Sequence, residues 1–309
     1  MHGPDPDHSV DDAQRAADRS GHLLRAALAD LEVARERPYY DEQADGAAGQ
    51  AYFADVDTAL APAELRAALA GLLAFTHDRP SPYKPMRLVY PWVDLHPDRK
   101  LRSIYSGATF EPEELIREDA RVEAERSARL SQRTAADPGL SAQALAAEAE
   151  AVEQELLYNC EHVVPQSWFA KHEPMRGDLH HLFACESNCN SFRGNTPYFD
   201  FTDFEEVVRT DCGKREENRF EPSDGKGAVS RATLYFLLRY PGLIGDATHE
   251  LQASQLPLLI EWHRLEPVGE WERHRNMAVE EIQGNRNPLI DHPEWATRID
   301  FLAGFGQPA

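Results

Sequence analysis

The feature that most constrains this chain is an abrupt change in charge near its middle. Residues 158–199 carry four acidic residues, three Lys or Arg and four His, so they are nearly neutral within a chain of formal charge −21. The preceding residues 111–157 hold twelve acids against five Arg and are rich in Ala. Charges that recur every three or four residues predict two solvated helices there, with a break at residues 137–139. We therefore expect an acidic helical insertion at about 111–157.

The remaining pattern predicts a mainly helical chain with a few short strands. Apolar spacing indicates one amphipathic helix within residues 1–38, a leader ahead of a single domain over residues 39–309. Helical composition recurs at residues 63–75, 230–240 and 252–263. Residues 88–95 and 101–105 have strand composition, although Pro91 restricts the first to an edge or irregular piece. The expected fold class is α+β.

Composition also limits the function classes. No run approaches eighteen apolar residues, which excludes a transmembrane helix and a membrane partner. The first 22 residues lack a basic region followed by an apolar one, so we expect a cytoplasmic protein. Acidic residues number 53 against 32 basic ones, and a field of that sign repels nucleic acid at long range. Any nucleic-acid chemistry must therefore depend on a local site that contains a cation.

The side chains suited to catalysis gather in the nearly neutral segment. Glu161-His162 enters a short apolar run that Pro165 ends, and Asp178-Leu179-His180-His181-Leu182 follows as a predicted helix. The segment closes with Asn190-Ser191-Phe192-Arg193-Gly194-Asn195. A carboxylate, an imidazole, an amide and a guanidinium are the groups needed to hydrolyse a phosphodiester.

Each group suits one part of that reaction. A neutral imidazole can take a proton from the attacking water, because its ordinary pKa of about 6.5 lies near working pH. Carboxylate and amide oxygens are ligands for Mg²⁺, which neutralises charge on phosphorus and on the leaving oxygen. A guanidinium can hold the phosphate oxygens. Adjacent strand residues point to opposite faces, so Glu161 and His162 can serve one phosphate only at a bend or a strand end.

These motifs, in this order, resemble the bacterial endonuclease I family of nonspecific nucleases with a ββα-metal (His-Me) finger. The likeness continues at residues 220–222, 226–227, 230–240 and 283–288, and spans roughly residues 39–300. The resemblance implies that His162 is the general base, that Glu161 and Asn190 bind the metal, and that Arg193 lies near the substrate phosphate.

The resemblance also implies a substrate, a cofactor and a location. It implies metal-dependent, largely sequence-nonspecific cleavage of DNA, and often of RNA, to 5′-phosphate ends, with Mg²⁺ as cofactor and Mn²⁺ or Ca²⁺ as substitutes. A secreted or periplasmic location is the alternative to the cytoplasm. A protein inhibitor is compatible with the sequence, and the oligomeric state stays open.

Other interpretations of the same residues stay open. Glu161 could simply pair with Arg193, Asn190 could cap a helix, and Arg193 could brace Asp178. We also consider Arg176 as a contact to the DNA backbone. For the whole chain, the alternative is a non-catalytic acidic protein, either an interaction module or a DNA mimic, with a structural Cys₄ zinc site.

The four cysteines allow three arrangements: free thiols, two disulfides or a structural Cys₄ zinc site. They are Cys160, Cys185, Cys189 and Cys212. The lack of a signal-peptide pattern in the first 22 residues disfavours disulfides, and the Cys185–Cys189 spacing allows two thiolates on one helical face. We favour zinc in a structural role.

Overall fold

The computed structural model describes residues 6–306, with side chains from residue 20 onward, so residues 1–5 of the predicted leader lie outside it. The α-helices are α1 (Pro6–Glu36), α2 (Glu42–Tyr52), α3 (Pro62–Thr76), α4 (Pro85–Leu88), α5 (Pro112–Ala136), α6 (Ala142–Glu155), α7 (Ser187–Arg193), α8 (Lys226–Arg239), α9 (Leu256–Leu265), α10 (Glu270–Gln283) and α11 (Pro288–Asp291). The strands are β1 (Leu101–Arg102), β2 (Thr109–Phe110), β3 (Cys160–His162), β4 (Leu182–Ala184), β5 (Val208–Thr210), β6 (Gly213–Glu216) and β7 (Arg219–Pro222).

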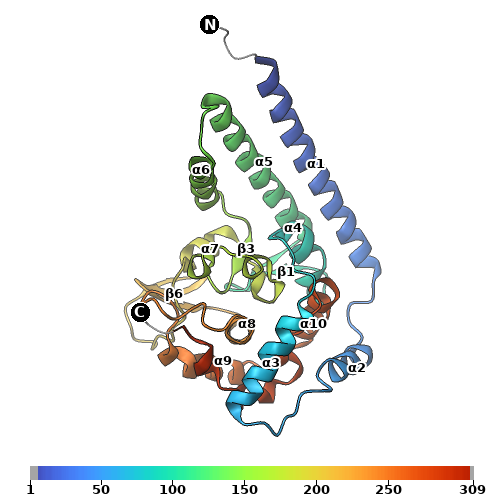
Figure 1. Cartoon of the computed structure of the whole chain (residues 1–309), viewed down its shortest axis with the longest axis vertical. Coiled ribbons are helices and arrows are strands. Elements are labelled where there is room, and N and C mark those ends of the chain that lie inside the picture. The colour runs from blue at the N-terminus through green and yellow to red at the C-terminus, as the bar shows by residue number, and fades with distance from the viewer. Residues whose placement is uncertain (1–5, 307–309) are drawn as a thin grey trace.

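The architecture is mainly helical, and the short strands pair antiparallel as β1–β2, β3–β4 and β5–β6–β7 (Figure 1). This confirms the α+β class that the sequence predicts. Among residues 6–306, no helix combines the length and apolar character needed to cross a membrane.

Helix α3 forms where the apolar spacing predicts a helix. Pro62 occupies its first turn, where a missing N–H leaves no helical hydrogen bond unmade. Leu65, Leu69 and Leu73 fall on one face and are completely buried. This face packs against α8, and the two helices lie in the larger of two hydrophobic cores.

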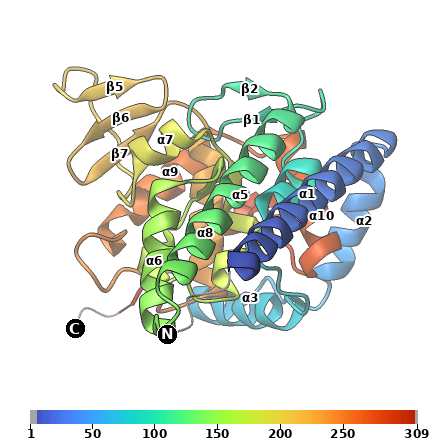
Figure 2. The ribbon, with the colours of Figure 1, turned by 90° about the horizontal axis from the view of Figure 1, so that it is seen from above.

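The acidic stretch forms the two predicted helices, α5 and α6, on either side of the break at residues 137–139. In the first half of α5, Leu115 and Ile116 are buried together with Ala27 and Leu31 of α1 in the second core. Figures 1 and 2 show α1 and α5 side by side, with α6 folding back along α5 toward the body. The later turns of α5 and most of α6 face solvent.

Residues 88–95 do not form the predicted strand. They continue α4 into a turn of π-helix, Val89–Val93, in which the N–H of Asp94 donates to the carbonyl of Val89. Tyr90 and Val93 are completely buried where this turn contacts α1, α5 and α10. The prediction was wrong because a short run of apolar residues has the same composition in a strand and in a helical turn buried on all sides.

Strands β3 and β4 and helix α7 form a ββα unit. The two strands pair in register from Cys160 opposite Ala184 to His162 opposite Leu182, and α7 packs back on β3. The helix predicted over 178–182 is instead one 3-10 turn that leads into β4. The unit places the end of β3 beside the side chains of α7.

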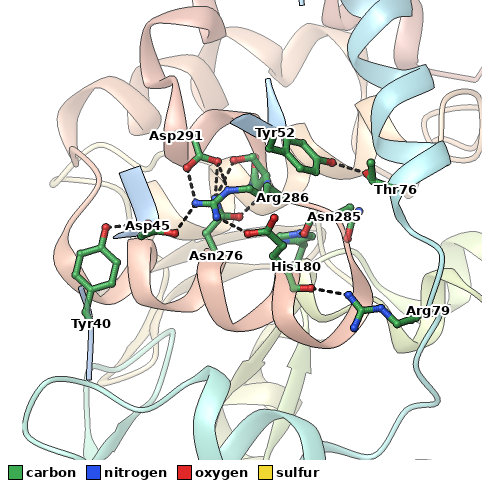
Figure 3. A network of polar contacts seen from close by, with 12 residues as sticks. Tyr40, Asp45, Tyr52, Thr76, Arg79, His180, Asn276, Asn285, Arg286 and Asp291 are labelled. Atoms are coloured by element: carbon green, nitrogen blue, oxygen red, sulfur yellow. Dashed lines mark hydrogen bonds and ion pairs between the residues drawn. The ribbon is translucent and has the colours of Figure 1, made fainter. Parts of the chain in front are cut away.

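A buried polar network holds the C-terminal loop that the sequence contains as QGNRNP. The side chain of Arg286 is completely buried, and it pairs with Asp45 of α2 at 2.8 Å and Asp291 of α11 at 2.7 Å (Figure 3). Gln283, at the end of α10, donates to Asp178 at 2.8 Å. Because Asp178 begins the turn before β4, the network joins α2, α10 and α11 to the ββα unit.

Candidate active site

A cleft of about 590 Å³ opens where β3 ends beside α7. Glu161 and His162 of β3 line it together with Asn190 and Arg193 of α7. Much of the remaining lining comes from α6 and from residues 165–171. The structure therefore brings together all four residues that the sequence predicts for the site.

The end of β3 explains how two neighbouring side chains reach one cleft. Glu161 and His162 pair regularly with Phe183 and Leu182, so their side chains leave opposite faces of the strand. His162 is the last strand residue, and both side chains line the cleft. The sequence required a bend or a strand end if Glu161 and His162 are to serve one phosphate, and the structure has a strand end here.

His162 is held in one tautomer. The residue is 5% exposed, and Nε2 lies 2.9 Å from the carbonyl oxygen of Arg176. A carbonyl only accepts hydrogen bonds, so Nε2 must carry the proton of the neutral ring, which leaves the lone pair on Nδ1. Among residues 20–306, no group hydrogen-bonds this Nδ1. Burial, with His181 as a second cause, lowers the pKa of His162 well below 6.5, so the ring is neutral at pH 7.

Glu161 is a buried carboxylate with one oxygen committed. Its Oε1 accepts from the Tyr105 hydroxyl at 2.7 Å and lies 3.2 Å from Nη1 of Arg193, whereas Oε2 has no hydrogen-bond partner among the described side chains. Burial raises the pKa of Glu161 to about 7, although Arg193 and Tyr105 oppose the shift. The protein therefore compensates this charge only in part, which favours a cation as a further partner.

Asn190 offers a second oxygen of the same kind. Its Nδ2 donates to the carbonyl of Cys160 at 3.0 Å, which fixes the amide and leaves Oδ1 without a partner among the described residues. Asn190 lies inside α7 rather than at its first residue, so the alternative of a helix cap is wrong. Oε2 of Glu161 and Oδ1 of Asn190 are the donor type that Mg²⁺ prefers, so the residues present fit such an ion.

Arg193 is nearly completely buried and contacts protein groups. Nη1 lies 3.2 Å from Glu161, and Nη2 donates to the carbonyl of Val163 at 2.9 Å. The alternative that Arg193 braces Asp178 is wrong, because Asp178 accepts instead from Tyr235, Tyr240, Gln283 and the N–H of His180. The pairing of Arg193 with Glu161 is present, and its contact with a substrate phosphate stays a prediction.

Sequence reasoning missed three contributors to the site. Tyr105 holds Glu161 from 56 positions earlier in the chain, and the Tyr83 ring centroid lies 4.5 Å from that of His162. Lys171 lines the cleft from the loop that follows β3. None of these belongs to a local motif, so only the folded chain reveals them.

The cysteines correct two expectations. Cys189 and Cys212 form a disulfide between α7 and the turn that joins β5 to β6, while Cys160 and Cys185 are buried free thiols. The predicted Cys₄ zinc site is therefore wrong, since two of its four ligands are bonded to each other. A disulfide is typical of an oxidising compartment, so the expectation of a cytoplasmic protein is not supported.

Comparison with known proteins matches residues 102–294 to the family Endonuclease I. The chain is 35% identical to an extracellular ribonuclease of Bacillus subtilis over 157 residues, which cover 46% of this chain and 54% of that protein. It is 32% identical to a periplasmic deoxyribonuclease of Aeromonas hydrophila over 130 residues, 40% of this chain and 50% of the relative. An extracellular deoxyribonuclease of the same organism is 34% identical over 125 residues, 38% of this chain and 50% of the relative. The chain thus spans about half the length of the curated relatives it matches.

Proposed function

This chain belongs to the endonuclease I family, and we propose that it is a metal-dependent, largely sequence-nonspecific endonuclease. It hydrolyses phosphodiester bonds of DNA, and also of RNA, and leaves 5′-phosphate ends. Relatives named as ribonuclease and as deoxyribonuclease both support this breadth of substrate. The observation that carries the proposal is a neutral imidazole with a free Nδ1 in the same cleft as two uncommitted oxygens, Oε2 of Glu161 and Oδ1 of Asn190.

His162 acts as the general base in this proposal. Nδ1 takes a proton from water as the water oxygen bonds to phosphorus and the bond from phosphorus to the 3′ oxygen breaks. The hydrogen bond from Nε2 to the carbonyl of Arg176 holds the ring in place and stabilises the imidazolium that forms.

Glu161 and Asn190 hold the cation, for which Mg²⁺ is the first choice and Mn²⁺ or Ca²⁺ are substitutes. When bound, the ion neutralises charge on the phosphate oxygens and on the departing 3′ oxygen. Arg193 keeps the Glu161 carboxylate in place and, as a residue of the cleft lining, lies near the substrate phosphate. One carboxylate and one amide suit a single ion rather than a two-metal site.

We place the protein outside the cytoplasm, in the periplasm or the medium. The Cys189–Cys212 disulfide and the extracellular and periplasmic relatives support this location.

Nicking of supercoiled plasmid tests the function. The wild-type chain should nick plasmid with Mg²⁺ and stop when a chelator is added, and the His162→Ala variant should not nick. His172→Ala is the matched control, because His172 is exposed and lies outside the cleft lining. A non-catalytic acidic protein or DNA mimic would not cut under any condition, and equal nicking by wild type and His162→Ala would reject the mechanism.

A further inference from the structure

Helix α6 presents one carboxylate to two cations, Lys171 in the cleft lining and Arg176 beside it. Oε1 of Glu153 lies 2.6 Å from Nη2 of Arg176, and Oε2 of the same side chain lies 3.1 Å from Nζ of Lys171. Glu150, one turn earlier on α6, lies 3.5 Å from the same Nζ. Each oxygen of Glu153 therefore has its own cation, so this carboxylate bridges the two basic side chains.

The bridged cations are close to the proposed general base. The backbone carbonyl of Arg176 accepts the hydrogen bond from His162, and Lys171, Glu153 and His162 all line the same cleft. Nε of Arg176 also donates a hydrogen bond to Oε1 of Gln166, another lining residue, at 2.9 Å. Arg193 lines the same cleft but is 1% exposed, and its guanidinium already pairs with Glu161.

The Glu153 carboxylate resembles a bound phosphodiester in its charge and in its number of acceptor oxygens. A phosphodiester carries one negative charge on two non-bridging oxygens, and Glu153 carries one negative charge on two oxygens. The side chains of Lys171 and Arg176 keep 28% and 29% of their surface exposed; Lys171 lines the cleft, and Arg176 contacts two lining residues, Glu153 and Gln166. A substrate phosphate and the Glu153 carboxylate would compete for the same donors.

We infer that Lys171 and Arg176 are the phosphate-binding cations of this cleft and that Glu153 occupies their phosphate position until nucleic acid displaces it. The inference rests on the proposed nuclease function and adds a substrate-binding pair and a competing carboxylate to it. It also assigns a role to the acidic insertion, since α6 carries the carboxylate to the cleft.

Glu153→Gln tests the inference against Glu155→Gln. Both substitutions remove one charge from α6, but Glu155 is 68% exposed, pairs with Arg129 and does not line the cleft. Affinity for a fluorescein-labelled DNA oligonucleotide is measured by anisotropy in the His162→Ala background, and KM and kcat for plasmid nicking in the wild-type background. A Lys171→Gln/Arg176→Gln variant completes the set.

Glu153→Gln should bind the oligonucleotide about fivefold more tightly than Glu155→Gln and lower KM with little change in kcat, because a competing charge is gone. Lys171→Gln/Arg176→Gln should weaken oligonucleotide binding. It should also reduce the slope of log affinity against log salt concentration by roughly one for each residue replaced. Glu153→Gln that binds as Glu155→Gln does, or more weakly, would overturn the inference, since Glu153 would then be only a brace for the two cations. A wild-type chain that fails to nick plasmid would instead reject the proposed function.

Discussion

The disulfide between Cys189 and Cys212 should stabilise both the fold and the site, and the Cys189→Ser/Cys212→Ser variant measures this. The two residues are 23 positions apart in sequence, and closing a loop of that length removes about 3 kcal/mol of chain entropy from the unfolded state. Both side chains are buried, so the replacement hydroxyls add some further cost. We expect the free energy of unfolding to fall by about 3 kcal/mol.

The same change should reach the cleft through α7. This helix has seven residues, too few to be stable alone, and it carries Asn190 directly after Cys189 and Arg193 four residues after it. Loss of the disulfide should therefore raise the Mg²⁺ concentration needed for half-maximal nicking, because Asn190 is less firmly held.

Urea denaturation followed by circular dichroism gives the free energy, and plasmid nicking across a Mg²⁺ series gives the second effect. Dithiothreitol should bring the wild-type chain to the stability of the variant and leave the variant unchanged, which serves as the internal control. A variant that unfolds within about 0.5 kcal/mol of wild type, with the same Mg²⁺ dependence, would refute the reasoning, because it would show that the disulfide constrains neither state.

Three further predictions follow from buried groups. Burial lowers the pKa of His180 to about 4, so the unfolded chain binds more protons than the folded one between pH 6.5 and 4, and stability is lost as pH falls through this window. The loss should be about 3 kcal/mol for this residue, and His180→Gln should flatten the pH profile of urea denaturation; an equally steep profile would contradict it. Arg193→Met leaves the buried Glu161 without its partner and should lower the free energy of unfolding by about 3 kcal/mol in the same assay, whereas an unchanged value would show that the pair contributes nothing. Elemental analysis of the dialysed protein should find no stoichiometric zinc, since Cys189 and Cys212 are bonded to each other; one zinc per chain would restore the Cys₄ site.

Local sequence patterns were sufficient to predict an element of the fold where one face or one run of residues determines its structure. The leucines of α3 recur at helical spacing and face α8, and the acidic residues 111–157 form the two helices that their charge spacing predicts. The residues of the candidate site could be predicted from the sequence for the same reason. Glu161 and His162 are adjacent, and Asn190 and Arg193 lie on one short helix.

The errors concern properties that depend on distant partners. Val89–Val93 has strand composition, but three helices surround it and it forms a helical turn. Cys189 lies four residues from Cys185, yet its partner is Cys212, beyond two loops. Spacing along the chain cannot decide such questions, because each depends on which segment packs against which.

The central claim is that Nδ1 of His162 removes the proton from the attacking water. Chemical rescue tests it most directly: the His162→Ala chain, which leaves a ring-sized space in the cleft, is assayed for plasmid nicking with added imidazole. We expect no nicking without imidazole and a rate that rises with the concentration of the neutral imidazole form, while wild type is unaffected. Nicking by His162→Ala at the wild-type rate in the absence of imidazole would contradict it.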